Sequence, residues 1–436
     1  MLKNKDIKVG IIGLGIVGSG TAEILIKQSK LLSRKMGAKL TLAKVCDRSS
    51  KNAKKLSIPS KQVCSDWREI VRDPDIDIVV ELMGGTQVAK EVVLEALKQG
   101  KHVVTANKAL LALHGKEIFK LAAQKNLYIC FEASVGGGIP ILRSLREGYA
   151  ANEIKSIQGI INGTCNYILS EMTEKGGDFL PVLKKAQELG YAEKDPSFDV
   201  DGVDAAHKLS ILLSIAHGVH VPFEKIYIEG IRLISALDIE CGKKFGYVIK
   251  LLGIAKKSGD FIEVRVHPCM IPQSSPLASV GDAFNAILIE GDYVGPGLLY
   301  GRGAGRNPTA SAVVGDIIEI VRNLSQGNQP CVPPLGFSPE QITEVKIKKM
   351  EDLHSDYYLR FSVRDVPGVL AKITALLSQH KISISSVYQH IQDEGKVIPI
   401  VLFTHRAQES DILKALKKID RLAEVKSKTL FIRVEK

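Results

Sequence analysis

The sequence predicts an α/β protein in three parts: a doubly wound parallel sheet, then an α+β region, then a small ferredoxin-like domain. Three observations lead to this fold class. Apolar strand-like runs alternate with helical segments up to about residue 132, which is typical of a parallel sheet covered by helices. Between about residues 133 and 325 the alternation of strands and helices is less regular. From residue 353 the chain follows the order strand, helix, strand, strand, helix, strand.

The composition is that of a multidomain globular protein, with 436 residues, 45% of them hydrophobic and 25% charged. The formal net charge is +11, but the lysines are spread over helices and only one tryptophan is present, so we expect no nucleic-acid binding. No long apolar run and no signal segment is visible, so we expect no membrane association and a cytoplasmic location. The seven widely separated cysteines predict reduced thiols rather than disulfides or structural zinc.

In the first part, a strand at 6–13 leads into a glycine-rich turn and then into a helix. The turn has the spacing Gly13-x-Gly15-x-x-Gly18, and its contacts are expected from Gly13, Gly15, Ile16, Val17 and Gly18. The glycines permit a tight turn and close backbone approach, and the N-terminus of the helix attracts a pyrophosphate. The motif therefore predicts a Rossmann-type dinucleotide site, with a tight turn lacking a ligand as the alternative. Further strands and helices alternate at 40–47, 51–56, 77–82, 87–99, 102–105, 112–125 and 127–132.

The second predicted strand ends at Asp47-Arg48, where the adenosine ribose would lie. Asp47 would favour the free 2′-hydroxyl of NAD, whereas Arg48 would favour the 2′-phosphate of NADP, and the sequence leaves both cofactors open. Thr86 and Lys108 follow two other strands at their carboxyl ends, where open α/β sheets bind ligands. Lys108 is therefore a candidate ligand contact, with an ordinary surface lysine as the alternative.

The middle part is expected to be α+β, with a glycine-dense segment at 295–305 before its last helix and a linker at 325–345. Its predicted helices are 141–150, 165–175, 179–189, 201–216 and 309–324. Its predicted strands are 154–161, 262–270 and 285–290.

The segment 190–208 is the most informative stretch of the chain. Its loop holds four acids: Glu193, Asp195, Asp199 and Asp201. Asp204 then opens a helix and Lys208 follows one turn later on the same face. Carboxylates in this arrangement could bind a substrate ammonium while the lysine donates a proton. The alternative is structural, with Asp201 as a helix N-cap and Asp204–Lys208 as a surface ion pair.

Five stretches together carry a resemblance to a known family: Asn107-Lys108-Ala-Leu-Leu-Ala, Glu132-Ala-Ser-Val-Gly-Gly-Gly-Ile-Pro, Gly159-Ile-Ile-Asn-Gly-Thr-Cys-Asn-Tyr-Ile-Leu, the segment 190–208, and Gly303-Ala-Gly-x-x-Pro-Thr-Ala-Ser-Ala. Residues 1 to about 325 resemble homoserine dehydrogenases. The C-terminal part, with Asp365-Val-Pro-Gly-Val-Leu-Ala-Lys-Ile and Ile382-Ser-Ile-Ser-Ser-Val, looks like an ACT domain. The resemblance implies the reversible NAD(P)H-dependent reduction of L-aspartate 4-semialdehyde to L-homoserine, a step in threonine, methionine and isoleucine biosynthesis. No kinase domain is present, so the monofunctional form is expected.

The resemblance also implies a domain division: an NAD(P)-binding domain at 1–132, a catalytic and dimerisation domain at 133–325, a linker at 326–352 and an ACT regulatory domain at 353–436. The helix 309–324 is expected to return to the first domain. A homodimer or homotetramer and a threonine effector at the ACT domain are the implied partners.

Individual roles carry over from the same resemblance. Lys208 is the expected general acid/base, with Lys108 and Asp204 as further catalytic residues. The substrate amino group is held by Glu193, and Asp199 and Asp204 complete the pocket. Gly303 belongs to a late loop that returns to the cofactor. The positions of a monovalent cation site, expected to hold sodium mostly through backbone carbonyls, are Glu132, Val135, Gly137 and Ile139; a plain glycine turn is the alternative.

Two other functions stay open. One is a different nicotinamide-dependent amino-acid dehydrogenase that acts on a C–N bond, and the other is a ligand-sensing regulatory protein without turnover. Cys165 is expected to be a buried structural cysteine rather than a thiol nucleophile. His207 adjoins Lys208 but points about 100° around the helix, so we expect a structural role for it.

Overall fold

The computed structural model describes residues 6–389 and 396–436. The chain forms two compact units, each built from three stretches. Unit 1 comprises Met1–Ile157, Ala206–Lys225 and Asn285–Val345, and unit 2 comprises Gln158–Ala205, Ile226–Phe284 and Lys346–Lys436. Three elements run from one stretch into the next across this division, namely β7 (Ile154–Ile160), α11 (Val203–His217) and β12 (Phe284–Gly291).

Unit 1 contains a six-stranded parallel sheet in the order β3-β2-β1-β4-β5-β6. Its strands are β1 (Asp6–Ile12), β2 (Lys39–Cys46), β3 (Val63–Cys64), β4 (Ile78–Glu81), β5 (His102–Thr105) and β6 (Ile129–Cys130). The strand order reverses direction at β1, which confirms the predicted doubly wound sheet. Such a reversal leaves a crevice at the carboxyl ends of the strands, where cofactors bind.

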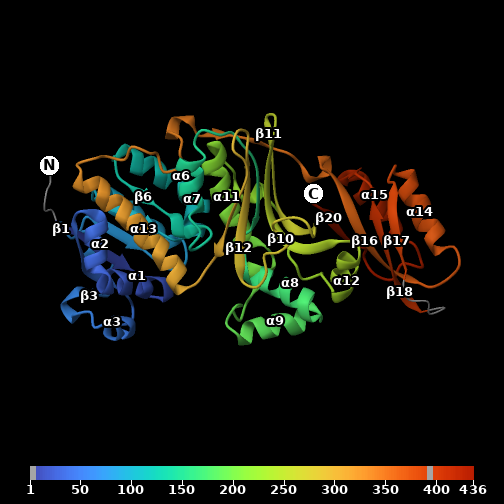
Figure 1. Ribbon diagram of the computed structural model, residues 1–436, viewed down its shortest axis with the longest axis horizontal. Helices are drawn as coiled ribbons and strands as arrows, with labels where there is room; N and C mark the ends of the chain where they lie inside the picture. The colour runs from blue at the N-terminus through green and yellow to red at the C-terminus, as the bar shows by residue number, and fades with distance from the viewer. Residues whose placement is uncertain (1–5, 390–395) are drawn as a thin grey trace. The chain divides into compact units, whose positions relative to one another are not determined.

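Helices cover this sheet because its strands are apolar on both faces. The helices of the first part are α1 (Ile16–Lys27), α2 (Ser29–Met36), α3 (Lys51–Lys55), α4 (Arg68–Val71), α5 (Gln87–Lys98) and α6 (Lys108–Gln124). A late helix, α13 (Arg306–Ser325), joins the same core, since its Val313, Ile317 and Ile320 are buried in one cluster with Ile7 and Val9. Figure 1 shows α13 lying across α1 and α2.

The remaining segments of unit 1 depart from the sequence-based predictions. The helix expected at 141–150 is a short α7 (Ile141–Arg143) followed by a π-helical turn at Ser144–Gly148. The glycine-dense segment, for which no strand was predicted, forms the strand β13 (Gly295–Arg302) beside β12 (Phe284–Gly291). The helix expected at 112–125 already begins at Lys108, because Asn107 caps it.

The segment expected to be a linker is packed on unit 1. It contains a 3₁₀ turn at Pro339–Gln341 and the strand β14 (Thr343–Glu344), which pairs in parallel with β8 (Val219–His220). Phe337 lies against Gly218, where an added Cβ would come within 2.8 Å of the ring. Composition alone could not reveal these contacts, since they depend on residues more than 100 positions away.

Unit 2 combines helices with a long antiparallel hairpin. The helices are α8 (Gly163–Lys175), α9 (Phe179–Glu188), α10 (Ser197–Val200) and α12 (Ala236–Lys244). The hairpin consists of β10 (Tyr247–Ser258) and β11 (Phe261–Pro272), joined at Gly259 in the left-handed region with φ of 59°. Two short strands, β9 (Tyr227–Ile228) and β15 (Lys346–Ile347), pair in parallel with β11.

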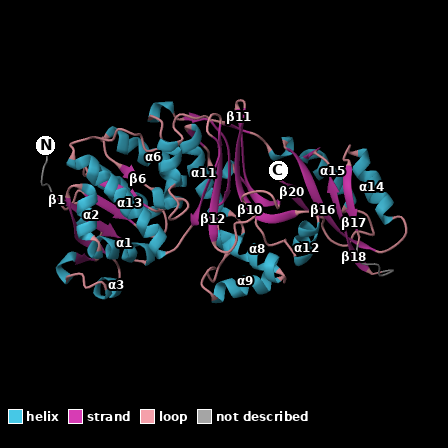
Figure 2. Ribbon diagram, in the orientation of Figure 1, coloured by secondary structure: helices cyan, strands magenta, loops and turns pink. Residues whose placement is uncertain are grey.

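The C-terminal part of unit 2 has the predicted order strand, helix, strand, strand, helix, strand, which Figure 2 shows as a sheet with its helices. Its elements are β16 (His354–Arg364), α14 (Val369–Gln379), β17 (Ile384–Tyr388), β18 (Val397–Thr404), a short β19 (Ala407–Gln408), α15 (Glu409–Ile419) and β20 (Leu430–Val434). Strand β20 pairs with β16 on one side and with β11 on the other. The C-terminal domain is therefore hydrogen-bonded into the hairpin sheet rather than attached only through its connecting segment.

A search for membrane-spanning helices gave a negative result within the described ranges. None of the helices there combines the length and the apolar character that crossing a bilayer requires.

Candidate functional site

The glycine-rich turn after β1 has the geometry of a dinucleotide site. Gly13 has a φ of 95°, and an added Cβ would lie 2.6 Å from the carbonyl oxygen of Leu82. A Cβ on Gly18 would lie 1.9 Å from the carbonyl oxygen of Gly13, so α1 can start this close to the turn only with glycine there. Apart from Gly15 and its two chain neighbours, none of the described residues has an atom within 4 Å of the Cβ position of Gly15, and the side chain of Ile16 is 72% exposed. The turn is thus tightly packed at Gly13 and Gly18 and open at Gly15 and Ile16, where a ligand can approach the backbone.

The residues that follow β2 support this turn. The carboxylate of Asp47 accepts hydrogen bonds from the backbone N–H groups of Leu14, at 3.1 Å, and Ser49, at 3.2 Å. Asn52 donates to the carbonyl of Leu14 at 2.7 Å. Arg48 is exposed and forms no ion pair within the described part of the chain. A cationic group therefore stands next to the place predicted for the ribose.

The carboxyl ends of β4 and β5 are tied together by Asn107. Its amide donates to the carbonyl of Gly85 at 2.7 Å, and its side-chain oxygen caps α6 by accepting from the N–H of Leu110 at 3.1 Å. Lys108 is consequently fixed at the first position of α6. Thr86 is at the N-cap position of α5, but its hydroxyl makes no capping bond. These predicted ligand contacts therefore lie at neighbouring strand ends.

Glu81, at the end of β4, is a buried carboxyl that the sequence analysis did not single out. It accepts hydrogen bonds from the hydroxyl of Thr105 at 2.6 Å and from the N–H of Met83 at 2.7 Å. Burial raises the pKa of Glu81 from 4.5 to about 7, against the opposing effect of these hydrogen bonds. A carboxyl at the strand ends of the sheet thus titrates near neutral pH.

In unit 2, one amide brings two of the predicted substrate carboxylates together. Asn162 is buried and caps α8 by accepting from the N–H of Cys165 at 2.8 Å. Its amide nitrogen donates to Asp199 at 2.7 Å and to Asp204 at 2.8 Å. The hydroxyl of Thr164 donates to the second oxygen of Asp199 at 3.1 Å. Two carboxylates held at one nitrogen create a concentrated negative charge suited to a substrate ammonium.

The other acids of the loop are arranged differently. Asp201 pairs with Arg232, and α11 begins only at Val203. The interpretation of Asp201 as the N-cap of this helix is therefore wrong, since Gly202 occupies that position. Glu193 is exposed on the loop, and its carbonyl accepts from Gln187 at 2.9 Å. Asp195 turns back on Ser197, whose N–H donates to its carboxylate at 3.1 Å.

Helix α11 carries the predicted proton donor. Asp204 and Lys208 are 2% and 7% exposed, so an ordinary surface ion pair between them is excluded. The ring of His207 packs against the ring of Phe223 with centroids 4.3 Å apart, in keeping with a structural role. Cys165 is fully buried and its thiol contacts the carbonyl of Asp199 at 3.2 Å. All seven cysteines are free thiols, as expected.

The loop predicted to hold a monovalent cation packs against the segment around Gly303. An added Cβ on Gly137 would lie 2.6 Å from the carbonyl of Gly303, and the N–H of Gly138 donates to the carbonyl of Arg302 at 3.1 Å. Within the described residues, no hydrogen bond reaches the carbonyl oxygens of Val135 and Gly137. Two buried carbonyls of this kind fit a cation that prefers oxygen ligands.

The other two predicted cation ligands fit less directly. Both carboxylate oxygens of Glu132 accept backbone N–H groups, those of Leu142 and Arg143, each at 2.8 Å. The carbonyl of Ile139 accepts from Ile141 at 2.8 Å. The carbonyl of Glu132 accepts only a long hydrogen bond, from the N–H of Val135 at 3.4 Å, so a cation at this loop would use that carbonyl rather than the carboxylate.

Besides Glu81, two residues near these sites were missed by the sequence analysis. Asn162 gave a signal, because an Asn before Gly-Thr-Cys is a common helix N-cap. Asn285 gave none. It is fully buried beside Gly303, and neither end of its amide has a hydrogen-bond partner in the described part of the chain. Buried amides without partners are rare and indicate a missing water, ion or ligand group.

Comparison with known proteins agrees with these features. Residues 140–318 match the homoserine dehydrogenase family, residues 13–132 match the NAD-binding domain of homoserine dehydrogenase, and residues 357–424 match the ACT domain family. A curated homoserine dehydrogenase from Neisseria gonorrhoeae is 47% identical over 431 residues, which cover 99% of both chains.

Solved structures agree as well. A homoserine dehydrogenase from Thiobacillus denitrificans is 45% identical and superposes with a TM-score of 0.93 over 99% of both chains. A hyperthermophilic archaeal homoserine dehydrogenase mutant, solved in complex with NADPH, is 29% identical with a TM-score of 0.63, covering 72% of this chain and 98% of its own. None of the relatives named here supports either of the two alternative functions. The chain belongs to the homoserine dehydrogenase family.

Proposed function

We propose that Lys208 is the general acid/base of this homoserine dehydrogenase, which interconverts L-aspartate 4-semialdehyde and L-homoserine. The observation that carries the proposal is a buried lysine one turn after Asp204, whose carboxylate Asn162 holds next to that of Asp199. When bound, the nicotinamide cofactor supplies or accepts the hydride. Lys208 gives its proton to the carbonyl oxygen in reduction and takes it back in oxidation. A lysine can both donate and accept a proton, which suits this reversible role.

The substrate is an amino acid, so its ammonium needs carboxylates. We propose that Glu193, Asp199 and Asp204 bind it, with Asn162 positioning the last two. Lys108, fixed at the start of α6 by Asn107, then assists the oxyanion near the nicotinamide. The assignment is chemically consistent, since the carboxylates are assigned to the cationic end of the substrate and the ammonium groups to the developing alkoxide.

For the cofactor, we propose that the turn Gly13–Gly18 holds the pyrophosphate, with contacts from Ile16 and Val17 within it and from Thr86 and Gly303 beyond it. We further propose a preference for NADP over NAD. Both oxygens of Asp47 already accept backbone N–H groups, that of Leu14 in the turn and that of Ser49 after β2, whereas Arg48 is exposed without a carboxylate partner among the described residues. A guanidinium so placed matches a 2′-phosphate.

A monovalent cation, sodium, is proposed at the loop of Val135 and Gly137, with the carbonyls of Glu132 and Ile139 nearby. The support is the pair of buried carbonyl oxygens without donors and the adjacent amide of Asn285. The cation would fix this loop against the segment of Gly303 and so help to shape the cofactor site.

At the level of the chain, we propose an NAD(P)-binding domain at 1–132, a catalytic and dimerisation domain at 133–325, a connecting segment at 326–352 and an ACT domain at 353–436. A homodimer or homotetramer and a cytoplasmic location are proposed with it. Seven free thiols fit a reducing compartment.

The Lys208 proposal is tested by Lys208→Ala. We expect turnover with homoserine to fall by about 10² or more, because general acid/base catalysis supplies roughly 10²–10⁴-fold. The control is Lys184→Ala, which removes an exposed lysine of α9. Circular dichroism verifies that both variants are folded. Near-normal turnover of folded Lys208→Ala would reject the assignment.

We also propose that threonine inhibits the enzyme through the ACT domain, at the turn before α14. Gly368 has a φ of 87° there and presents the N-terminus of a helix, where a carboxylate is favoured. The test uses the full-length chain, because removing β20 would expose the edge of β11. Initial rates should fall at millimolar threonine and stay unchanged with millimolar alanine. Rates indifferent to threonine would leave the domain an assembly module.

A further inference from the structure

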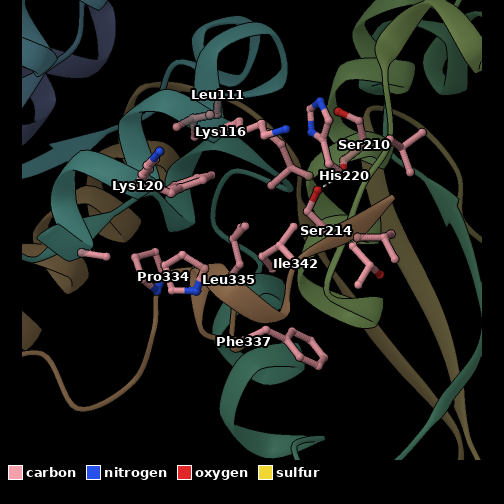
Figure 3. Close-up of a pocket in the computed structure, with 18 of the residues that line it drawn as sticks. Leu111, Lys116, Lys120, Ser210, Ser214, His220, Pro334, Leu335, Phe337 and Ile342 are labelled. Atoms are coloured by element: carbon pink, nitrogen blue, oxygen red, sulfur yellow. Dashed lines mark hydrogen bonds between the residues drawn. The ribbon is translucent and has the colours of Figure 1, made fainter. Parts of the chain in front are cut away.

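Unit 1 contains a cavity of about 500 Å³ that none of the proposed catalytic residues lines. Three segments enclose it: the middle of α6, the last two turns of α11 with β8, and the residues 334–344, here called the strap. Figure 3 shows Pro334, Leu335, Phe337 and Ile342 of the strap facing side chains of α6 and α11. The volume lies within the range of sites that hold small organic ligands.

The interior of this cavity is apolar. Leu111, Ile211, Val219 and Leu335 line it and are buried, and the rings of Phe119 and Phe337 add aromatic surface. The two hydroxyls on its α11 wall are already used. Ser210 donates to the carbonyl of His207 at 2.8 Å, and Ser214 donates to the carbonyl of Ser210 at 3.0 Å. A ligand body here would gain from hydrophobic contact rather than from hydrogen bonds.

The rim carries two cations from one face of α6. Lys116 and Lys120 are one turn apart, both are exposed, and neither forms an ion pair with any residue that the structure describes. Figure 3 shows Lys116 directed toward His220, and both burial and the charge of Lys116 lower the pKa of His220.

The acids that line the cavity come from the strap. Glu344 lies opposite His220 in the pairing of β14 with β8, and Glu340 is exposed on the strap. Neither acid forms an ion pair with the two lysines within the described residues, so the charges of Lys116 and Lys120 are not neutralised by the strap.

The strap is anchored at the cavity, so the space is a formed site. The N–H of Thr343 donates to the carbonyl of Gly218 at 3.1 Å, next to the β8–β14 pairing. Gly218 has a φ of 61°, and the ring of Phe337 occupies the space that its Cβ would need. Glycine is therefore required for the strap to close in this way.

We propose that this cavity binds a small apolar carboxylate, whose hydrocarbon body lies between α6, α11 and the strap and whose carboxylate meets Lys116 and Lys120. The site bears on catalysis through its helices. Helix α6 begins at Lys108, and Ser210 follows Lys208 by two residues in α11. An occupant that fixes α6 and α11 would change the orientation of Lys108 and Lys208. This last step rests on their proposed roles, whereas the binding itself does not.

The binding is tested with 4-phenylbutyrate as the probe, by saturation-transfer difference NMR on the full-length chain. The same-length alcohol and amine, 4-phenylbutanol and 4-phenylbutylamine, isolate the charge. We expect the carboxylate to bind about fivefold more tightly than the alcohol, the upper range for an exposed ion pair, and the amine to bind most weakly. Lys116→Gln/Lys120→Gln should remove this advantage. Lys414→Gln/Lys418→Gln, an exposed lysine pair of the same spacing on α15, should keep it.

Occupancy of the cavity is tested with Ala112→Phe, which fills it from α6 and should abolish binding of all three probes. Hydrogen exchange gives a second readout on the unaltered chain, since the probe should slow exchange across the strap. Equal affinity for the carboxylate and the amine, or no protection of the strap, would overturn the proposed site.

The link to catalysis has its own readout. Saturating 4-phenylbutyrate should change the initial rate of homoserine oxidation at least about twofold in the unaltered chain and leave Ala112→Phe unaffected. Binding without a rate change would refute the link while leaving the site. A failure of the proposed catalytic role would appear instead in Lys208→Ala, which is assayed without the probe.

Discussion

At the residue scale, single polar side chains determine where the charges of this enzyme lie. One nitrogen of Asn162 holds Asp199 and Asp204, and one carboxylate of Asp47 supports the glycine-rich turn. Neither role follows from the residue type alone, because asparagine and aspartate are equally common as caps and in turns. Both roles follow from the position at the end of a strand or the start of a helix.

Arg48 gives a prediction at this scale. If its exposed guanidinium receives the 2′-phosphate of NADP, Arg48→Ala should lower kcat/KM for NADPH by about tenfold or more, because charge-assisted hydrogen bonds contribute roughly 1.5–3 kcal/mol. The value for NADH should change little. Steady-state kinetics with both cofactors measure the ratio, and Arg72→Ala is the control for charge on the surface of unit 1. An equal loss with both cofactors would argue against recognition of the phosphate.

At the scale of elements, the strand β20 joins two parts of unit 2. Beyond its backbone pairing, it supplies Arg433, which is 3% exposed. The guanidinium forms two hydrogen bonds to Glu409 at the start of α15, at 2.6 and 2.7 Å, and one to Glu229 after β9 at 3.1 Å. The segment after Glu229 in turn contacts the acidic loop, since Ile231 donates to the carbonyl of Val200 at 2.9 Å. One arginine thus links the C-terminal domain to the element before α11.

Arg433→Met should therefore destabilise the protein far more than its surface counterpart Arg421→Met. Removing one partner of a buried ion pair typically costs 3–5 kcal/mol, since the carboxylates of Glu409 and Glu229 are left without their cation. Urea unfolding measures the two variants. Adding Glu409→Gln to Arg433→Met should recover part of the loss. A difference below about 1 kcal/mol between the two arginine variants would contradict a buried electrostatic link.

At the scale of the whole molecule, the pH dependence of stability has one identifiable contributor. The pKa of Glu81 is about 7 in the fold and 4.5 without its environment. The folded state therefore holds its proton more tightly, and stability falls as the pH rises from about 4.5 through about 7. Below that window Glu81 is protonated in both states.

Glu81→Gln removes this titration. Relative to the variant, the unaltered protein should lose about 3 kcal/mol of stability between pH 4.5 and pH 8, as an upper value for a shift of this size. Thermal unfolding across this range gives the comparison, with Glu91→Gln as the exposed control on α5. If stability changed with pH in the same way in all three proteins, ionisation of Glu81 would not destabilise the fold, and the prediction would be wrong.

The linear order of residues is enough to predict the parallel sheet, the glycine-rich turn, the strand-helix-strand-strand-helix-strand order of the C-terminal domain, and the family. Each of these depends on local spacing: period-two or continuous apolar runs, glycines at fixed positions, and contiguous motifs. The return of α13 to the first core was also expected, but only from the family resemblance.

Tertiary structure alone decided the rest. The strap packs on α6 and α11, a glycine-dense segment forms β13, and β20 pairs with β11. The amide of Asn285 is buried beside Gly303, and α11 begins at Val203 rather than at the predicted residue 201. These features arise from contacts between residues far apart in the chain, whose free energy depends on burial and on which polar groups find partners. Local patterns carry no information about such partners.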